Sequence, residues 1–294
     1  MVALTPVLLA ASSVVGLSQA AAAAAVAAAA PQPRAVAYKT YKGDGTVAQG
    51  WPDVSQWASF DTIWANNVGP SAGACRWLEV GANSDAENAV MKAAIMQAGK
   101  DTGLDPRFIL AAVYQESSGC VRMYTTRSTT QGYRNPGLLQ SFMGEHTCND
   151  PVAGIPLLTP CPDAQIRGMI TDGVGLTTSD GLMQTVARSK ATDVSRYYKG
   201  ALLYNSGVMP ASGNLGQGRS NPCYSSDIAN RVMGWIDDQS PCNRRSLMID
   251  GWPPGRQLSL SLSPQPRRRR AEEDGTRDGV QKWGRVVWWW LLVL

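Results

Sequence analysis

The chain has 294 residues, six cysteines, one histidine and a formal net charge of +4. Eight basic and five acidic side chains lie from Ser246 onward, so this tail supplies +3 and the rest of the chain is nearly neutral. A nearly neutral body argues against a general nucleic-acid binder. A single histidine and no Cys-x-x-Cys pair argue against a structural zinc site or a Cys–His catalytic pair, so we expect no metal.

Residues 1–30 carry no charged side chain and run from a short apolar stretch into an alanine tract. This pattern predicts a secretory signal peptide, with several possible cleavage sites between residues 20 and 30. A membrane anchor is disfavoured, because alanine is only weakly apolar and no basic stop-transfer cluster follows. We therefore expect a secreted, extracellular protein that does not span a membrane. Residues 31–50 contain Pro, Gly and Lys, and we expect a mobile lead-in.

Aromatic residues cluster between Trp51 and Trp64, where they could line a sugar cleft or pack in the core, and we favour packing. Ser84 or Asp85 can then cap a helix whose apolar stripe runs from Met91 to Ala98. Gly99 and Gly103 should end that helix. We expect it to form a hairpin with the helix that follows.

The most informative segment runs from Asp105 to Gly119. Asp105 is a good N-cap, proline suits the first helical position, and Gly119 is a natural stop. Ile109, Ala112, Val113 and Glu116 have the spacing of one helical face, so a carboxyl group is carried on an apolar stripe at the helix C-terminus. Burial and the negative end of the helix dipole both disfavour the carboxylate. We expect a raised pKa, as a general acid needs, or else a partly exposed or ion-paired glutamate.

Residues 121–136 are polar and are expected to form a loop over a cleft, to which residues 137–140 return. His146 has no obvious partner in the sequence and is interpreted as an ordinary polar residue. We expect Asp163 to cap a short helix. A Gly-Leu-Met-Gln sequence at 181–184 is the alternative to residues 137–140 as the segment that returns to the cleft. We prefer the earlier segment, and the later one could be a packing turn.

Asp193 is expected to cap a helix that carries Tyr204 on its apolar face, with a core tyrosine as the alternative. A loop over 206–222 and a helix from Ser225 to Gln239 follow. One domain is therefore expected over 51–245. The tail 246–294 has no clear period and is expected to be disordered, with a membrane-surface anchor as the alternative.

An even cysteine count in an exported chain predicts three disulfides, formed by Cys75, Cys120, Cys148, Cys161, Cys223 and Cys242. Cys148 and Cys161 bracket a loop rich in Pro and Gly, so we expect them to pair. A helix over Ser225–Gln239 would hold Cys223 and Cys242 roughly 20 Å apart, too far for a disulfide. We therefore expect Cys75 and Cys120 to share those two partners.

Three short motifs, in order, resemble those of lytic transglycosylases and goose-type lysozymes (glycoside hydrolase family 23), especially the small secreted fungal members. Gln115-Glu116-Ser117-Ser118-Gly119 resembles the catalytic-glutamate motif. Gly137-Leu138-Leu139-Gln140, after Asn135-Pro136, resembles Gly-Leu-Met-Gln, and Tyr204-Asn205-Ser206-Gly207 resembles Tyr-Asn-Ala-Gly. The likeness spans roughly residues 40–243. It implies a mainly α, lysozyme-like fold with a loop-rich cleft, stapled by disulfides.

The resemblance also implies an enzyme that cleaves β-1,4 bonds next to N-acetylated amino sugars in peptidoglycan, as a monomer and without a cofactor. Glu116 would be the general acid, Gln140 would line the sugar site, and Tyr204 would lie near Glu116 with Asn205 supporting it. The family's lysozymes also use a base for water, and Glu145, Asp150, Asp172 and Asp180 are candidates. A chitin-directed enzyme, or a non-catalytic wall-polysaccharide-binding protein on the same fold, remains the alternative.

Overall fold

The computed structural model describes residues 36–128, 131–236 and 239–248. The signal-peptide prediction and the tail from residue 249 lie outside them. As predicted, the described part is mainly α-helical. Its helices are α1 (Phe60–Trp77), α2 (Asp85–Thr102), α3 (Pro106–Ser117), α4 (Asp163–Val174), α5 (Leu182–Arg188), α6 (Ser195–Ser206), α7 (Tyr224–Val232) and α8 (Arg244–Met248). Short 3-10 turns occur at Val47–Gln49, Val54–Gln56, Pro151–Ala153 and Leu215–Gln217.

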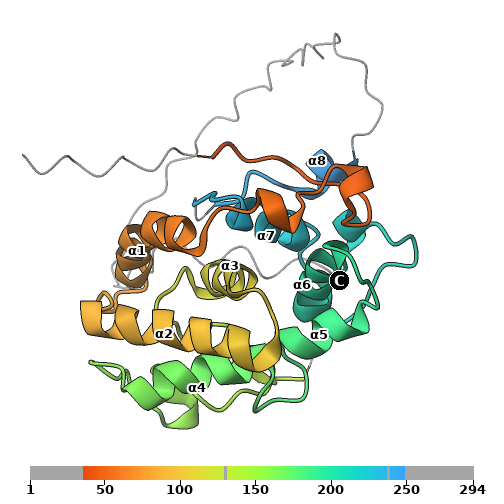
Figure 1. The fold of residues 1–294 in the computed structure, drawn as a ribbon. Helices are drawn as coiled ribbons and strands as arrows, with labels where there is room; N and C mark the ends of the chain where they lie inside the picture. The colour runs from red at the N-terminus through yellow and green to blue at the C-terminus, as the bar shows by residue number, and fades with distance from the viewer. Residues whose placement is uncertain (1–35, 129–130, 237–238, 249–294) are drawn as a thin grey trace, which may run out of the picture. The chain divides into compact units, whose positions relative to one another are not determined.

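Helix α3 is the centre of the fold and packs against α1, α2 and α7 (Figure 1). Every residue from Phe108 to Tyr114 is buried, so the helix is enclosed on all sides. Such a helix is held by apolar burial of its whole circumference and not by one amphipathic stripe. Two further helix pairs pack together, α2 with α4 and α5 with α6.

The starts of α2 and α3, and the end of α2 at Gly103, follow from local sequence as predicted. Two predicted stops are wrong, because Gly99 lies inside α2 and Ser118, one residue before Gly119, is the left-handed cap of α3. The Ser84 hydroxyl accepts from the backbone N–H of Glu87, and the Glu87 carboxylate accepts from the N–H of Ser84, which is a capping box. Gly103 ends α2 in the left-handed region, at φ 71°. Asp105 caps α3 through the N–H of Arg107. Two helices separated by so short a turn form the expected hairpin.

The segment expected to be a loop over a cleft contains a small antiparallel hairpin. Strands β1 (Thr126–Arg127) and β2 (Arg134–Asn135) pair with Thr126 opposite Asn135. Arg127 and Arg134 both form ion pairs with the buried Asp150. This shared carboxylate ties the hairpin to the loop that Cys148 and Cys161 close.

The aromatic segment packs in the core, as favoured above. Trp51 and Trp57 are buried, and the Trp57 indole N–H donates to the Tyr198 hydroxyl at 2.9 Å. The prediction of a mobile lead-in is wrong from residue 36 onward. Tyr41 is buried against Trp51, and the Tyr38 hydroxyl donates to Asp227 at 2.6 Å. The segment packs on the domain because the Tyr38 side chain and the backbone of residues 39 and 41 form hydrogen bonds with residues of α7.

The expected boundary after residue 245 is also wrong, because residues 244–248 form α8 and Leu247 is buried. Two predicted caps differ from the observed ones by one residue each. Pro162 precedes α4, whose first residue is Asp163. Val194 precedes α6, while the Asp193 carboxylate accepts from the N–H of Ser195.

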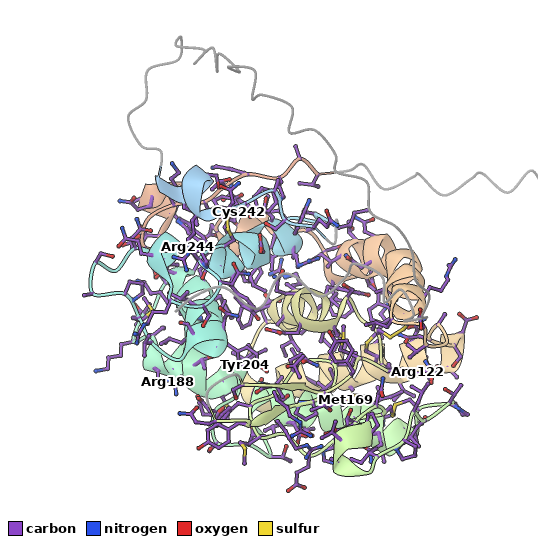
Figure 2. The ribbon with its side chains drawn as sticks, turned by 180° about the vertical axis from the view of Figure 1, so that it is seen from behind. Arg122, Met169, Arg188, Tyr204, Cys242 and Arg244 are labelled. Atoms are coloured by element: carbon purple, nitrogen blue, oxygen red, sulfur yellow. A yellow bond between two sulfur atoms is a disulfide. The ribbon has the colours of Figure 1, made fainter. Side chains whose placement is uncertain are left out.

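All six cysteines form disulfides, but only one predicted pairing is right. Cys148 pairs with Cys161 as expected, whereas Cys75 pairs with Cys120 and Cys223 with Cys242. The error arose from the length assigned to the last large helix. Helix α7 ends at Val232, and Gly234 turns the chain at φ 100°. Cys242, labelled in Figure 2, thereby returns to within 5.8 Å of Cys223, Cα to Cα.

Three disulfides fit the oxidising environment that an exported protein meets. Among the described residues, no helix combines the length and the apolar character that crossing a membrane requires.

Candidate active site

The end of α3 brings Glu116 to the start of α7. Tyr224 is the first residue of α7, and its hydroxyl donates a hydrogen bond of 2.5 Å to Glu116 Oε1. The Cys223–Cys242 disulfide lies directly before Tyr224 in the chain. A covalent link therefore fixes the backbone next to the phenol that contacts the carboxyl group.

Glu116 has the electrostatic character expected of a general acid. Burial raises the pKa of its carboxyl group to about 7, and the hydrogen bond from Tyr224 partly opposes that rise. The side chain still keeps some exposure to solvent. A carboxyl group that is protonated near neutral pH and reachable from solvent can donate a proton to a bound molecule.

Tyr204, labelled in Figure 2, lies on α6, and the charge of Glu116 acts on its hydroxyl. Its hydroxyl donates to the backbone carbonyl of Leu139 at 2.7 Å. Burial, with a further contribution from the Glu116 charge, raises the pKa of Tyr204 well above its usual range. The pKa of Tyr224 is raised for the same reasons. Both phenols therefore stay protonated and act as hydrogen-bond donors.

The structure thus brings Glu116 and Tyr204 together, whereas the side chains of Gln140 and Asn205 point to other partners. The Gln140 amide donates to the carbonyls of Tyr124 and Gly137 and accepts from the Thr126 hydroxyl, which joins its loop to the hairpin. The Asn205 amide oxygen accepts from the backbone N–H of Asn221 and so holds the 206–222 loop. Contact of either residue with a sugar stays a prediction.

The second Gly-Leu-Met-Gln sequence forms the start of α5. Gln184 accepts from the N–H of Gly181 and donates to the carbonyl of Gly175, which closes the turn onto the end of α4. A Cβ atom at Gly181 would lie 2.2 Å from the backbone nitrogen of Gly175. Glycine is needed there because two backbone segments touch, which is the geometry of a packing turn.

Three of the four candidate second carboxylates are already engaged. Asp150 is buried between two arginines, and Asp180 forms an ion pair with Arg188 at 2.6 Å. Asp172 accepts from the backbone N–H groups of Glu145 and His146 and from the Thr177 hydroxyl. In the part of the chain that the structure describes, only the Glu145 carboxylate among these four has no partner.

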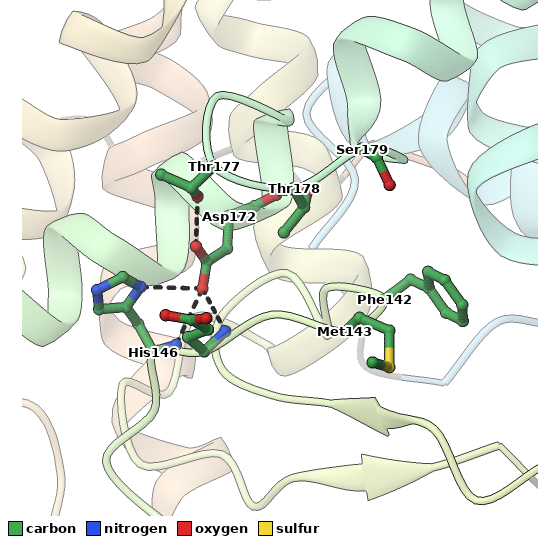
Figure 3. Close-up of a pocket in the computed structure, with 8 residues that line it drawn as sticks. Phe142, Met143, His146, Asp172, Thr177, Thr178 and Ser179 are labelled. Atoms are coloured by element: carbon green, nitrogen blue, oxygen red, sulfur yellow. Dashed lines mark hydrogen bonds and ion pairs between the residues drawn. The ribbon is translucent and has the colours of Figure 1, made fainter.

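His146, for which the sequence offered no obvious partner, has one in the folded chain. Its Nδ1 lies 3.0 Å from Oδ2 of Asp172, as Figure 3 shows. The contact joins the 142–146 segment to the end of α4. Sequence reasoning missed it because residues 146 and 172 belong to different elements and come together only in the folded chain.

Tyr224 is the contact that sequence reasoning missed entirely. A signal was present, because Tyr224, Ile228 and Val232 recur every four residues and all are buried on α7. Beginning the helix at Ser225 left Tyr224 outside it.

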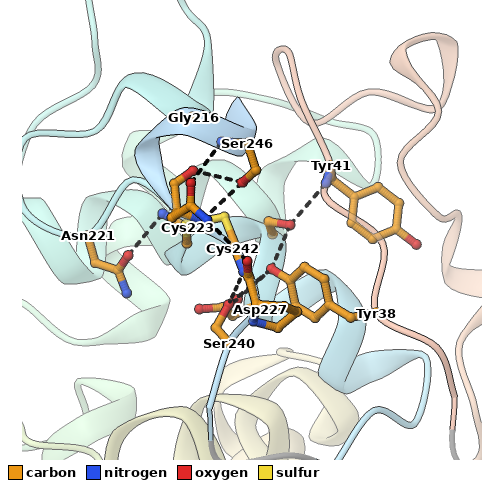
Figure 4. The surroundings of a disulfide bond; sticks show 12 residues. Tyr38, Tyr41, Gly216, Asn221, Cys223, Asp227, Ser240, Cys242 and Ser246 are labelled. Atoms are coloured by element: carbon orange, nitrogen blue, oxygen red, sulfur yellow. Dashed lines mark hydrogen bonds between the residues drawn. A yellow bond between two sulfur atoms is a disulfide. The ribbon is translucent and has the colours of Figure 1, made fainter. Parts of the chain in front are cut away.

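A buried polar network supports the other side of α7. The Gln115 side chain contacts both Asp227 and Arg231, and Asp227 also accepts from Tyr38 and Ser240 (Figure 4). Gln115 precedes Glu116, so these contacts fix α3 against α7 next to the acid. Burial raises the pKa of Asp227, and its hydrogen bonds and Arg231 oppose that rise.

Comparison of the chain with protein-family models, curated proteins and solved structures finds no match.

Proposed function

We propose that the chain is a secreted glycosidase with a lysozyme-like fold that cleaves β-1,4 bonds next to N-acetylated amino sugars, with peptidoglycan as the expected polymer. The observation that carries the proposal is the state of Glu116. It is a largely enclosed carboxyl group with a pKa of about 7, held by Tyr224 at the end of a rigid central helix. A general acid for a glycosidic oxygen needs this combination.

In this reaction Glu116 protonates the leaving oxygen, and the sugar passes through an oxocarbenium-like state. The Tyr224 hydroxyl then stabilises the carboxylate that forms, because it donates to Oε1. The Tyr204 hydroxyl donates to the Leu139 carbonyl, so it holds the 137–140 segment against α6 next to the acid. The fate of the sugar cation divides the two reaction types. Ring closure by its own C6 hydroxyl, whose proton passes to the Glu116 carboxylate, gives an anhydro product. Attack by water, whose proton passes to a carboxylate base, gives a reducing end.

The direct test is clearance of bacterial cell walls by the full chain and by Glu116→Gln. Glutamine keeps the shape but cannot donate the proton, so cleavage should fall by ~10²-fold or more. Circular dichroism should show an unchanged fold. Cleavage within a few-fold of wild type would remove Glu116 from the mechanism.

Mass spectrometry of the products sharpens the test. Anhydro ends would indicate a transglycosylase, and reducing ends a hydrolase. Polymer that is bound but left intact by the wild-type chain would favour a non-catalytic wall-binding protein.

A further inference from the structure

Three polar side chains of α7 face the end of α3. Tyr224, Asp227 and Arg231 have the i, i+3, i+7 spacing of one helical face. Tyr224 contacts Glu116, and the other two contact Gln115, the residue before it. All three are at most 5% exposed, so the row lies in the interface between the two helices. The contact between the phenol and the acid is therefore one end of a longer polar row.

The Gln115 amide is held at both ends by groups of different kinds. Its NH2 group donates to Asp227 Oδ2 at 3.4 Å, and its carbonyl oxygen accepts from Arg231 Nε at 2.7 Å. The amide N–H suits only the carboxyl oxygen and the amide oxygen suits only the guanidinium group, so the amide has one orientation. A planar group bound at both ends sets the register of α3 on α7, one residue before the acid.

Asp227 is in turn held from two other parts of the chain. Its Oδ1 accepts from the hydroxyl groups of Tyr38 and Ser240, each at 2.6 Å (Figure 4). Two donors on one oxygen fix the carboxyl plane and leave Oδ2 to face Gln115. The Tyr38 ring itself meets Trp235 edge-to-face, with 4.9 Å between ring centroids.

The segment 38–41 is also bound along α7 by its backbone. The N–H and C=O of Lys39 both pair with the Asn230 side chain, at 2.8 Å each, and the N–H of Tyr41 donates to Ser226 at 3.0 Å. Asn230 and Ser226 are each 1% exposed. Buried polar groups that lose a partner are costly, so α7 is stabilised in its place by this segment.

We infer that Tyr38 and Asp227 are positioning residues for the proposed proton donor, and that the segment 38–41 belongs to the structure that supports the active site. Tyr38 fixes Asp227, Asp227 fixes Gln115, and Gln115 sets the position of Glu116 against α7. The inference rests on the proposed function and extends the active site to a segment that is far from Glu116 in the sequence.

The test asks whether the hydrogen bond from Tyr224 to Glu116 keeps its effect when this series of contacts is cut. The observable is the pKa of Glu116 in the full chain, measured by NMR on protein whose glutamates carry 13C at the side-chain carboxyl carbon. Glu116→Gln identifies the resonance. Tyr224→Phe removes the bond and should raise that pKa by roughly half to one unit.

Tyr224→Phe is then repeated in two other backgrounds. Asp227→Asn keeps an oxygen for the two hydroxyl donors but turns an NH2 group towards Gln115, so that two donors meet. Tyr38→Phe removes one hydroxyl and keeps the ring. In Asp227→Asn the effect of Tyr224→Phe should fall below about half of its wild-type size, because residues that belong to one network are not additive. In Tyr38→Phe it should fall by a smaller, measurable amount.

Ser225→Ala is the matched control. The Ser225 hydroxyl is buried on α7 and donates to the carbonyl of Tyr198, which belongs to α6. Its loss should lower the free energy of unfolding, as the loss of any buried hydrogen bond does. The effect of Tyr224→Phe should keep its wild-type size in this background. Urea unfolding of each background shows that equal losses of stability are being compared.

The outcomes separate the positioning role from the proposed function. An effect of Tyr224→Phe that is unchanged in Asp227→Asn and in Tyr38→Phe would overturn the positioning role and spare the glycosidase proposal. An equal reduction in Ser225→Ala would mean a general loosening of α7 and would overturn it too. If Asp227→Asn does not fold, Tyr38→Phe decides alone.

Clearance of cell walls is measured on the same proteins. Tyr38→Phe should slow it by roughly two- to tenfold, because a small misplacement of a catalytic group is costly. Should the wild-type chain clear no wall, the proposed function fails, while the titration, which needs no substrate, still decides whether Tyr38 and Asp227 position Glu116.

Discussion

Glu87 and Glu116 are two enclosed glutamates on the adjacent helices α2 and α3. Their surroundings shift the pKa values of the two carboxyl groups in opposite directions. Glu87 accepts hydrogen bonds from the backbone N–H groups of Ser84 and Cys161, and from the guanidinium group of Arg122 at 2.5 Å. Arg122 is labelled in Figure 2. Burial alone would raise its pKa, but these donors outweigh burial and lower it. Glu116 has one neutral phenol as its donor, and burial raises its pKa to about 7.

The comparison shows that burial by itself does not make an acid. The number and charge of the donors that reach the carboxylate decide which protonation state survives. Glu87 is a structural anion that joins the start of α2 to the Cys148–Cys161 loop. Glu116 is left short of donors at a place that solvent still reaches, and this is the arrangement that proton donation requires.

The largest effect should come from removing the structural anion. Glu87→Ala leaves Arg122 buried without its ion-pair partner, and loss of one member of a buried pair costs about 3–5 kcal/mol. Urea unfolding should show this loss in the free energy of unfolding. Glu87→Gln, which keeps an acceptor, should lose less. Equal stability of Glu87→Ala and wild type would show that the pair contributes nothing.

The charged form of Glu116 should destabilise the fold, whereas the charged form of Glu87 stabilises it. Its pKa is near 4.5 when unfolded and about 7 when folded, so the folded protein binds the proton more tightly. The resulting loss of stability is absent below pH 4.5, grows as the pH rises towards 7, and is complete above it. Glu116→Gln removes that loss.

Melting curves between pH 4 and 8 should therefore show that the stability of Glu116→Gln relative to wild type increases as the pH rises. The gain should reach on the order of 1–3 kcal/mol above pH 7. A difference that does not vary with pH would contradict the raised pKa.

The smallest effect concerns Tyr224. Its hydrogen bond lowers the pKa of Glu116, so Tyr224→Phe should raise that pKa further. Cleavage needs protonated Glu116, and the alkaline limb of the pH–rate profile should move upward by roughly half to one pH unit, since one unit is about 1.4 kcal/mol. A limb that moves downward would mean that the phenol stabilises the protonated acid instead.

Local sequence was sufficient for the helices that carry the site. The caps at Ser84 and Asp105, and the place of Glu116 on the apolar face of α3, were predicted because they depend on residues within one or two turns. The raised pKa of Glu116 was expected for a similar reason. The even cysteine count likewise predicted that every cysteine would be paired.

Contacts between distant segments were decided by the tertiary structure alone. The turn at Gly234 shortened α7 and brought Cys242 back to Cys223. The packing of α7 on α3 placed the Tyr224 hydroxyl on Glu116, 108 residues earlier in the chain. The return of the 142–146 segment to α4 gave His146 its partner. Periodicity and capping report only on neighbours along the chain, whereas each of these contacts depends on how whole helices pack.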